Sequence, residues 1–165
     1  YEQSSQPERK IQCLLGLLGI FINAIFRQGM ITRFELEAHA AGPGAEASLT
    51  GNWLRLNRAL AQPEMEIPAI EAYGWARIPH VFFQPFYCAN YLLSAMAVLH
   101  LAGQHQQDPA GFCRRYRSFL DAGGSADSAT LLQGLELDLT RPGFAAEACA
   151  QLERWIEALE VLCAA

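Results

Sequence analysis

The feature that most constrains this chain is a long series of apolar residues near its start, spaced as on one helix. From Pro7 to about His39, apolar side chains recur every three or four positions. They are Ile11, Leu14, Leu15, Leu18, Phe21, Ile22, Ile25, Phe26, Met30, Phe34 and Ala38. This spacing predicts one helix of about eight turns. Gly16, Gly19 and Gly29 each cost roughly 1 kcal/mol relative to alanine, so we expect them where a neighbouring helix approaches closely.

Within that helix, the run Ile11 to Phe26 resembles a membrane span or a signal peptide in its apolar character. It is shorter than the roughly 18–20 residues that a span needs. It also contains Gln12 and Asn23, and no small-x-small cleavage site follows it. We therefore expect a buried core helix and no membrane partner. Because residue 1 is Tyr1 and not methionine, we expect the chain to be a piece of a longer protein.

Turn signals divide the rest of the chain into further helices. The AGPG sequence at 41–44 marks a break, and a loop is expected over 62–68. Helices are expected over 46–62, 85–102, 108–121, 127–133 and 142–162, the last capped by Thr140. Between Pro79 and Pro85 we expect an extended, aromatic-rich stretch. No period-two alternation persists, so the predicted fold class is an all-α helical bundle forming a single domain over 1–165.

Charge and cysteine usage narrow the function further. The net charge is -5, and the one basic cluster is Arg114, Arg115 and Arg117, which is typical of a solvated helix face. We therefore expect no nucleic-acid partner. The five cysteines form no C-x-x-C pair, and most lie in apolar helical patterns. They predict buried, reduced thiols and a cytoplasmic protein.

One group of residues stands out chemically, although the sequence has no H-E-x-x-H, G-x-S-x-G or Walker motif. His80 follows Pro79, and Tyr87 and Tyr91 are spaced to share one face of a helix. Such a group can aim several neutral hydrogen-bond donors at one developing oxyanion. From the residue types alone, the favoured interpretation is a buried aromatic cluster whose polar tips bond to the backbone.

A resemblance to a known family bears on this choice. The segment WARIPHVFFQPFYCANYLLSAMAVLHLA, at 75–102, resembles a signature of oligoendopeptidase F-type zinc metallopeptidases, within the thimet-oligopeptidase-like superfamily. The segments FRQGMITRFELEAH (26–39), LDAGGSADSATL (120–131) and LDLTRP (137–142) also resemble that family, in the same order. The resemblance implies that the chain is the C-terminal part of a larger, zincin-like helical peptidase that hydrolyses oligopeptides.

In that family, two histidines of H-E-x-x-H and a later glutamate hold one zinc ion, and the glutamate within the motif is the general base. This chain has no H-E-x-x-H, so the resemblance implies that zinc is held by the missing N-terminal part and that this chain alone binds none. It assigns substrate positioning and oxyanion stabilisation to His80, Tyr87 and Tyr91. The chain departs from the family's usual tyrosines at Phe82, Phe83 and Ala89. An alternative is therefore a non-catalytic helical module that has kept the peptidase fold.

For the remaining polar candidates, we expect structural roles. Glu35 and His39 are spaced to face each other as a structural pair, and His39 could approach a cavity. His100 and His105 lie near a helix end without ligand partners at metal spacing. Arg77 either braces the His80 segment through a carboxylate or is solvated. One face of 11–34 is expected to be apolar and exposed, so that the chain dimerises or needs the missing part of the peptidase.

Overall fold

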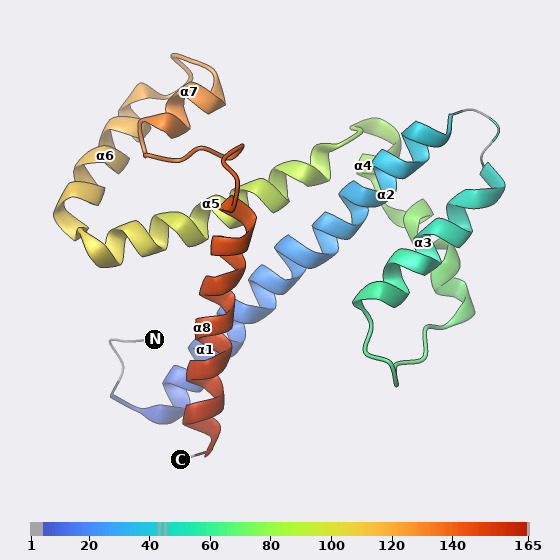
Figure 1. Ribbon diagram of the computed structural model, residues 1–165, viewed down its shortest axis with the longest axis horizontal. Helices are drawn as coiled ribbons and strands as arrows, with labels where there is room; N and C mark the ends of the chain where they lie inside the picture. The colour runs from blue at the N-terminus through green and yellow to red at the C-terminus, as the bar shows by residue number, and fades with distance from the viewer. Residues whose placement is uncertain (1–4, 43, 45, 165) are drawn as a thin grey trace. The chain divides into compact units, whose positions relative to one another are not determined.

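Helices follow one another along the part of the chain that the structure describes. The structure is a computed structural model, which describes residues 5–42, 44 and 46–164. Its elements are α1 (Pro7–Phe21), the π-helix η1 (Ile22–Arg27), α2 (Gln28–Ala41), α3 (Glu46–Leu60), the 3-10 helix η2 (Ala69–Arg77), α4 (Pro79–Phe83), α5 (Tyr87–Gln107), α6 (Pro109–Ala122), α7 (Ser128–Gln133) and α8 (Phe144–Ala164) (Figure 1). No strand occurs among the described residues. The predicted all-α class is confirmed.

Contacts within the chain divide it into two compact units. Unit 1 contains residues 1–21 and 93–165, and unit 2 contains residues 22–92. Each unit has its own buried cluster, so each is described by itself. That the two form a single domain stays a prediction.

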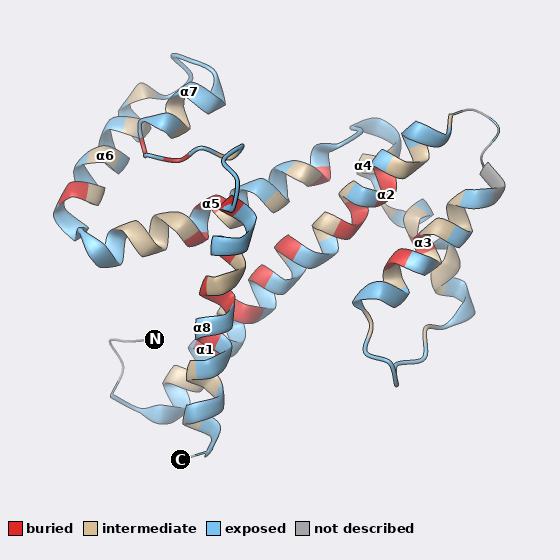
Figure 2. Cartoon of the chain, in the orientation of Figure 1, coloured by how far each residue is buried: buried red, intermediate tan, exposed pale blue. Residues whose placement is uncertain are grey.

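The predicted N-terminal helix is present, and it continues through α1, η1 and α2 without a break. Over Pro7–Ala41 it is long and apolar enough to span a membrane by length and composition, so the length argument made from the run Ile11 to Phe26 was wrong. A mostly buried core helix of a soluble protein passes the same test, and so does a signal sequence, whereas 33% of the apolar window is buried here. Buried apolar residues recur along the helix (Figure 2), so the expected buried core helix is found only in part. The π-helical segment was not foreseen.

In unit 1, α1 packs against α8. Leu14, Leu18 and Phe21 are buried on α1, and the Phe21 ring lies 5.5 Å from that of Trp155 on α8. A second cluster in this unit is built from Ala97, Leu135, Leu137 and Phe144. Burying such side chains contributes about 1.5–3 kcal/mol each relative to leaving them exposed.

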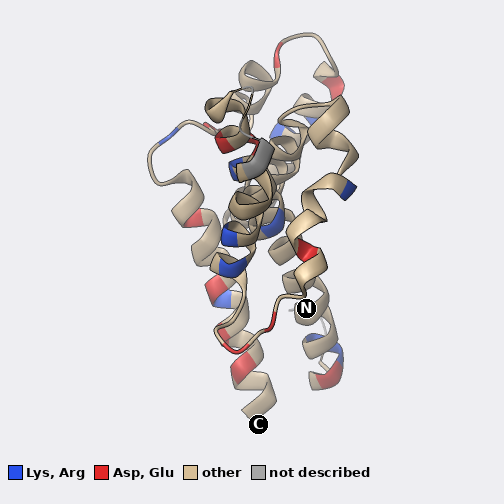
Figure 3. Ribbon diagram, turned by 90° about the vertical axis from the view of Figure 1, so that its right-hand side faces the viewer, with Lys and Arg blue, Asp and Glu red and all other residues tan. Residues whose placement is uncertain are grey.

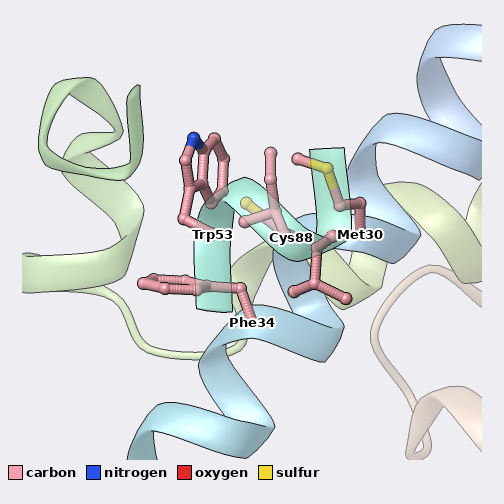
Figure 4. Close-up of a cluster of buried hydrophobic side chains, with 6 residues drawn as sticks. Met30, Phe34, Trp53 and Cys88 are labelled. Atoms are coloured by element: carbon pink, nitrogen blue, oxygen red, sulfur yellow. The ribbon is translucent and has the colours of Figure 1, made fainter. Parts of the chain in front are cut away.

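In unit 2, α2, α3 and the start of α5 share one core. Its buried members are Met30, Ile31, Phe34, Trp53, Leu56 and Cys88. Figure 4 shows the Phe34 ring below that of Trp53, with Cys88 and Met30 beside them. The Phe34 and Trp53 rings meet edge to face, with centroids 5.2 Å apart, which is a favoured aromatic geometry. This core therefore ties α5, which carries both candidate tyrosines, to α2 and α3.

Several predicted helix ends are confirmed by their caps. Asp108 accepts a hydrogen bond from the Gly111 backbone N–H at 2.9 Å, with Pro109 in the first turn of α6. α6 ends at Gly123, whose φ is 51°. α2 ends at Gly42, with φ 72°, whereas Pro43 of the predicted break lies outside the described residues.

Two predicted starts and one predicted conformation were wrong. The stretch after Pro79 contains the short helix α4, because Pro79 opens a helical turn directly after Ile78, which is extended with φ -101° and ψ 101°. α5 begins at Tyr87, after Pro85. Thr140 does not cap α8, because Asp138 accepts hydrogen bonds from the Thr140 N–H and hydroxyl at 2.9 and 2.6 Å.

The predicted close approach at the glycines holds only at Gly29, where a Cβ would lie 3.8 Å from the Leu92 side chain. A Cβ at Gly16 or Gly19 would have no neighbour within 4 Å, so that expectation was wrong there.

All five cysteines are free, as expected, but Cys88 is the one that is buried. Cys13, Cys113 and Cys163 are exposed, so the predicted burial was wrong for them. Cys13 is an example: it directly precedes the buried Leu14, and neighbouring positions on a helix point in different directions, so an apolar neighbour in the sequence does not imply burial.

Charged residues are interspersed along the described part of the chain (Figure 3). Glu37 on α2 bonds to Arg33 at 2.7 Å and also to Arg55 of α3. In the predicted basic cluster, Arg115 lies 3.8 Å from Asp108. Arg115 is partly buried, whereas Arg114 and Arg117 are exposed as on a solvated helix face. The absence of a nucleic-acid partner stays a prediction.

Candidate functional site

The candidate site begins with two tyrosines in the first two turns of α5. Tyr87 and Tyr91 are one helical turn apart, and their ring centroids lie 5.3 Å apart at an interplanar angle of 80°. Their exposed fractions are 39% and 44%. Both rings are therefore anchored on one side and open to solvent on the other, as the i,i+4 spacing predicted.

His80 joins them from α4. Its ring is stacked on that of Tyr87, with centroids 5.1 Å apart and planes 5° apart. The same ring meets that of Tyr91 edge to face, at 6.1 Å and 82°. The structure thus brings together all three residues that the sequence singled out. His80 is partly buried, and its position is set by Pro79 at the first position of α4.

The environment of Tyr91 keeps its phenol protonated. Partial desolvation raises the pKa of Tyr91, and the neighbouring Tyr87 raises it further, by charge repulsion and by a side-chain hydrogen bond. A phenol normally has a pKa near 10, so Tyr91 is a neutral hydrogen-bond donor at and above neutral pH. A neutral donor is the form that can stabilise a developing negative charge.

The turn that leads into α5 has an unusual backbone. Phe86 has a φ of 63°, in the left-handed region that a residue with a bulky side chain rarely adopts. Its backbone N–H donates a hydrogen bond to Oε1 of Glu35, at 2.8 Å. Glu35 is 1% exposed. This contact could not be predicted from local sequence patterns, since the two residues are 51 positions apart.

Glu35 and His39 were expected to face each other, and both instead reach Phe86. The His39 ring lies 4.9 Å from the Phe86 ring, at an interplanar angle of 39°. Glu35 also lies beside the buried Cys88. Burial, followed by the charge of Glu35, raises the pKa of the Cys88 thiol, so that thiol stays protonated and resembles a small apolar side chain.

Arg77 pairs with a carboxylate within η2 and is also exposed to solvent, so both alternatives left open by the sequence hold in part. Its Nη2 donates to Oε1 of Glu71 at 2.7 Å, within η2. The Ile78 N–H closes the end of η2 by donating to the Trp75 carbonyl at 3.1 Å. Arg77 is exposed, so the ion pair contributes only about 0–1 kcal/mol.

An apolar cavity of about 240 Å³ lies on the same unit as the three rings. Its lining includes the rings of Phe34, His39, Trp75 and Phe82, together with Val81. Because Val81 and Phe82 follow His80 on α4, the cavity and the ring cluster share one short helix. His39 also lines this cavity, and its approach to a substrate cavity of the whole peptidase stays a prediction.

The remaining histidines have structural partners in unit 1. The His100 ring stacks on that of Phe144 at 4.1 Å, and its Nε2 lies 2.9 Å from the Phe144 carbonyl oxygen. The His105 ring meets that of Phe112 edge to face at 5.4 Å. Among the described residues, no three His, Cys, Asp or Glu side chains gather as a metal site. His80, Tyr87 and Tyr91 likewise provide no zinc ligand set.

Comparisons with known proteins point to one group of peptidases. No protein-family model matches the chain. The oligoendopeptidase F homolog of Lactococcus lactis subsp. lactis is 26% identical over 166 residues, and the plasmid oligoendopeptidase F of Lactococcus lactis subsp. cremoris is 26% identical over 172 residues. Each alignment covers 98% of this chain and 27% of the relative, so the chain spans about a quarter of their length.

A solved structure agrees in fold. The crystal structure of oligoendopeptidase-F from Enterococcus faecium superposes with a TM-score of 0.87 and 23% sequence identity, over 98% of this chain and 32% of that one. Sequence and fold therefore both identify this chain as similar, over nearly its whole length, to a segment of oligoendopeptidase F.

Proposed function

We propose that this chain is the C-terminal segment of a zinc metalloendopeptidase that hydrolyses oligopeptides in the cytoplasm. Its relatives are named oligoendopeptidase F, which supports peptide hydrolysis by the whole protein. The observation that carries the proposal is the convergence of His80, Tyr87 and Tyr91 within one ring cluster. In this proposal, the three residues position the substrate and stabilise the oxyanion of the tetrahedral intermediate.

The chemistry follows from the donors that the cluster presents. When water adds to a peptide carbonyl, its oxygen gains a negative charge that was absent in the substrate. A phenol O–H from Tyr87 or Tyr91 can donate to that oxygen, and so can an imidazole N–H of His80. Such donors stabilise the transition state more than the ground state and thereby raise kcat. Removal of one donor of this kind typically costs about 10²–10³ in turnover.

The zinc ion of the proposed peptidase is held outside this chain. The H-E-x-x-H motif is absent from its sequence, and the described residues offer no group of three ligands. We predict that the chain alone binds no stoichiometric zinc and cleaves no peptide. Tight one-to-one zinc binding by elemental analysis, with activity lost to a chelator, would contradict this prediction.

The exposed apolar residues of the N-terminal helix suit contact with the rest of that peptidase. Leu15 and Ile20 on α1 are 55% and 64% exposed, and Ile22 and Phe26 on η1 are 50% and 43% exposed. Side chains of this kind gain free energy when another surface covers them. In isolation, the chain is expected to use the same side chains to dimerise. Sedimentation that shows a monomer at high concentration, without hydrophobic-dye binding, would count against this.

The decisive test of the proposal is the reading frame upstream of Tyr1. An H-E-x-x-H motif followed by a glutamate about 25 residues later supports the peptidase, because those residues supply the ligands and the general base. Its absence supports a non-catalytic helical module that has kept the fold. The departures at Phe82, Phe83 and Ala89 are the observation that favours this second candidate.

A further inference from the structure

The direction in which α5 leaves its preceding turn depends on a single residue, Phe86. Its φ of 63° is one that a residue with a bulky side chain adopts only when its surroundings hold it there. Tyr87 is the next residue and the first of α5. A return of Phe86 to an ordinary negative φ would turn the following chain by roughly 120°. Tyr87 could not then stay stacked on His80.

The group that holds this conformation comes from α2. The Phe86 N–H lies at the start of α5, where backbone N–H groups have no partner within the helix. It donates a hydrogen bond to Glu35 Oε1 at 2.8 Å. Glu35 is 1% exposed and is flanked in the core by Phe34 and Cys88. A carboxyl group in such surroundings is unfavourable unless its bonding offsets the lost hydration. Replacement by an apolar side chain would remove that cost and also the hydrogen bond that the Phe86 N–H donates to α2.

The side chain of Phe86 is held as well. His39 lies one turn after Glu35 on α2, and its ring packs on that of Phe86 at 4.9 Å. Two residues on the same face of α2 therefore hold the same turn residue, one through its backbone and one through its ring. This double contact distinguishes the turn from an ordinary helix start, where one capping bond suffices.

We propose that Glu35 is a positioning residue that, with His39, holds Phe86 in the left-handed conformation and so aligns Tyr87 and Tyr91 with His80. It touches no reacting atom and acts through the turn. The consequence for catalysis rests on the proposed function, whereas the consequence for the ring cluster does not. Catalytic groups must be held within about 0.5 Å of their productive geometry, so loss of this alignment is expected to lower kcat.

The test compares two variants of nearly equal size in the full chain. Glu35→Gln keeps an oxygen that can accept the Phe86 N–H, whereas Glu35→Met fills the same space without an acceptor. With isotope-labelled tyrosine and histidine, NMR measures the nuclear Overhauser contact between the His80 and Tyr87 rings. We expect Glu35→Gln to retain this contact and Glu35→Met to lose it, while far-UV circular dichroism stays unchanged. Retention of the contact in Glu35→Met would overturn the proposal.

A second substitution separates backbone strain from loss of packing. Glycine adopts a positive φ without steric cost, so adding Phe86→Gly to Glu35→Met is expected to restore the His80–Tyr87 contact at least in part. Failure to restore it would contradict the role given to the backbone of Phe86. If Glu35→Met does not fold, amide exchange in the unmodified chain decides instead. The Phe86 N–H is expected to be protected, and exchange as fast as in an open loop would overturn the proposal.

Kinetics in the intact peptidase complete the test and keep the two proposals apart. Glu35→Met is expected to lower kcat at least tenfold with KM little changed, and Glu35→Gln to recover most of it. If Glu35→Met abolishes the ring contact and leaves kcat intact, the positioning role in catalysis is wrong. If Tyr87→Phe and Tyr91→Phe also leave kcat intact, it is the function proposed for the cluster that has failed.

Discussion

The core beneath the candidate site gives a sharp prediction for Phe34→Ala. Phe34 is 1% exposed and packs edge to face on Trp53, within the cluster that also buries Cys88 of α5. Truncation of a fully buried phenylalanine to alanine costs about 3–5 kcal/mol, from lost transfer free energy and the cavity that remains. The Trp53 contact contributes about 0.5–1.5 kcal/mol of this. Because small proteins are stable by about 5–15 kcal/mol, the variant loses a large fraction of its stability.

The assay is urea unfolding followed by tryptophan fluorescence and by circular dichroism. The matched control is Phe83→Ala, which removes the same side chain from the same unit at a position that is 82% exposed. Surface substitutions usually change the unfolding free energy by about 0.5 kcal/mol or less. We therefore expect a lower urea midpoint for Phe34→Ala and almost none of that change for Phe83→Ala. Equal changes in the two variants would refute the core described for unit 2.

Three further predictions concern a helix cap and two titrating groups. Asp108→Ala removes the bond to the Gly111 N–H and should cost about 1 kcal/mol in thermal unfolding. Hydrogen bonding to Arg33 lowers the pKa of Glu37 from its ordinary 4.5. The ionised Glu37 side chain therefore adds to the free energy of unfolding above pH 4.5, and this contribution is lost as pH falls through the lower pKa of the folded state. In acid unfolding experiments, Glu37→Gln should make the free energy of unfolding depend less on pH. Desolvation and Tyr87 raise the pKa of Tyr91. The stabilising contribution of its protonated phenol is therefore present below pH 10 and is lost as pH rises further. In an ultraviolet titration of the phenols, Tyr91→Phe should remove a step that occurs above the ordinary phenol pKa.

Each of these three predictions has a control within the chain. Asp121→Ala changes an exposed aspartate at the other end of α6 and should leave that cap intact. Glu64→Gln removes an exposed carboxylate from a loop of unit 2, and Tyr73→Phe removes a phenol that is 59% exposed. Control variants that behave like the test variants would show that the cap and the two altered pKa values do not arise from the contacts described.

Much of the fold could be predicted from the sequence because its signals are local. The Asp108–Pro109 pair predicts a helix start, because the capping carboxylate and the proline affect only the backbone groups of the next few residues. The apolar period from Ile11 onward predicts the N-terminal helix for the same reason. The error at Thr140 shows the limit of such reasoning. Its hydroxyl bonds to Asp138, two residues away, and a competing local bond of that kind cannot be ranked from residue types.

Part of the candidate site could likewise be predicted from the sequence, and part could not. His80, Tyr87 and Tyr91 lie close together in sequence, so their spacing and the family resemblance sufficed to predict the ring cluster. The conformation of Phe86 was not predictable, because nothing in its neighbours demands a positive φ and the group that bonds to it lies on another helix. Pro79 and Pro85 suggested an extended stretch, whereas the residues between them complete one turn of α4.

The measurement that tests the central claim most directly is the kinetics of the intact peptidase on an oligopeptide substrate. Tyr87→Phe and Tyr91→Phe remove one donor each and should lower kcat by about 10²–10³. KM and zinc content should stay nearly unchanged, and His80→Ala should cost at least as much. Tyr73→Phe is the control and should have no effect. If the three substitutions at the cluster change KM alone, these residues contribute only to substrate binding, and the oxyanion role proposed for them is wrong.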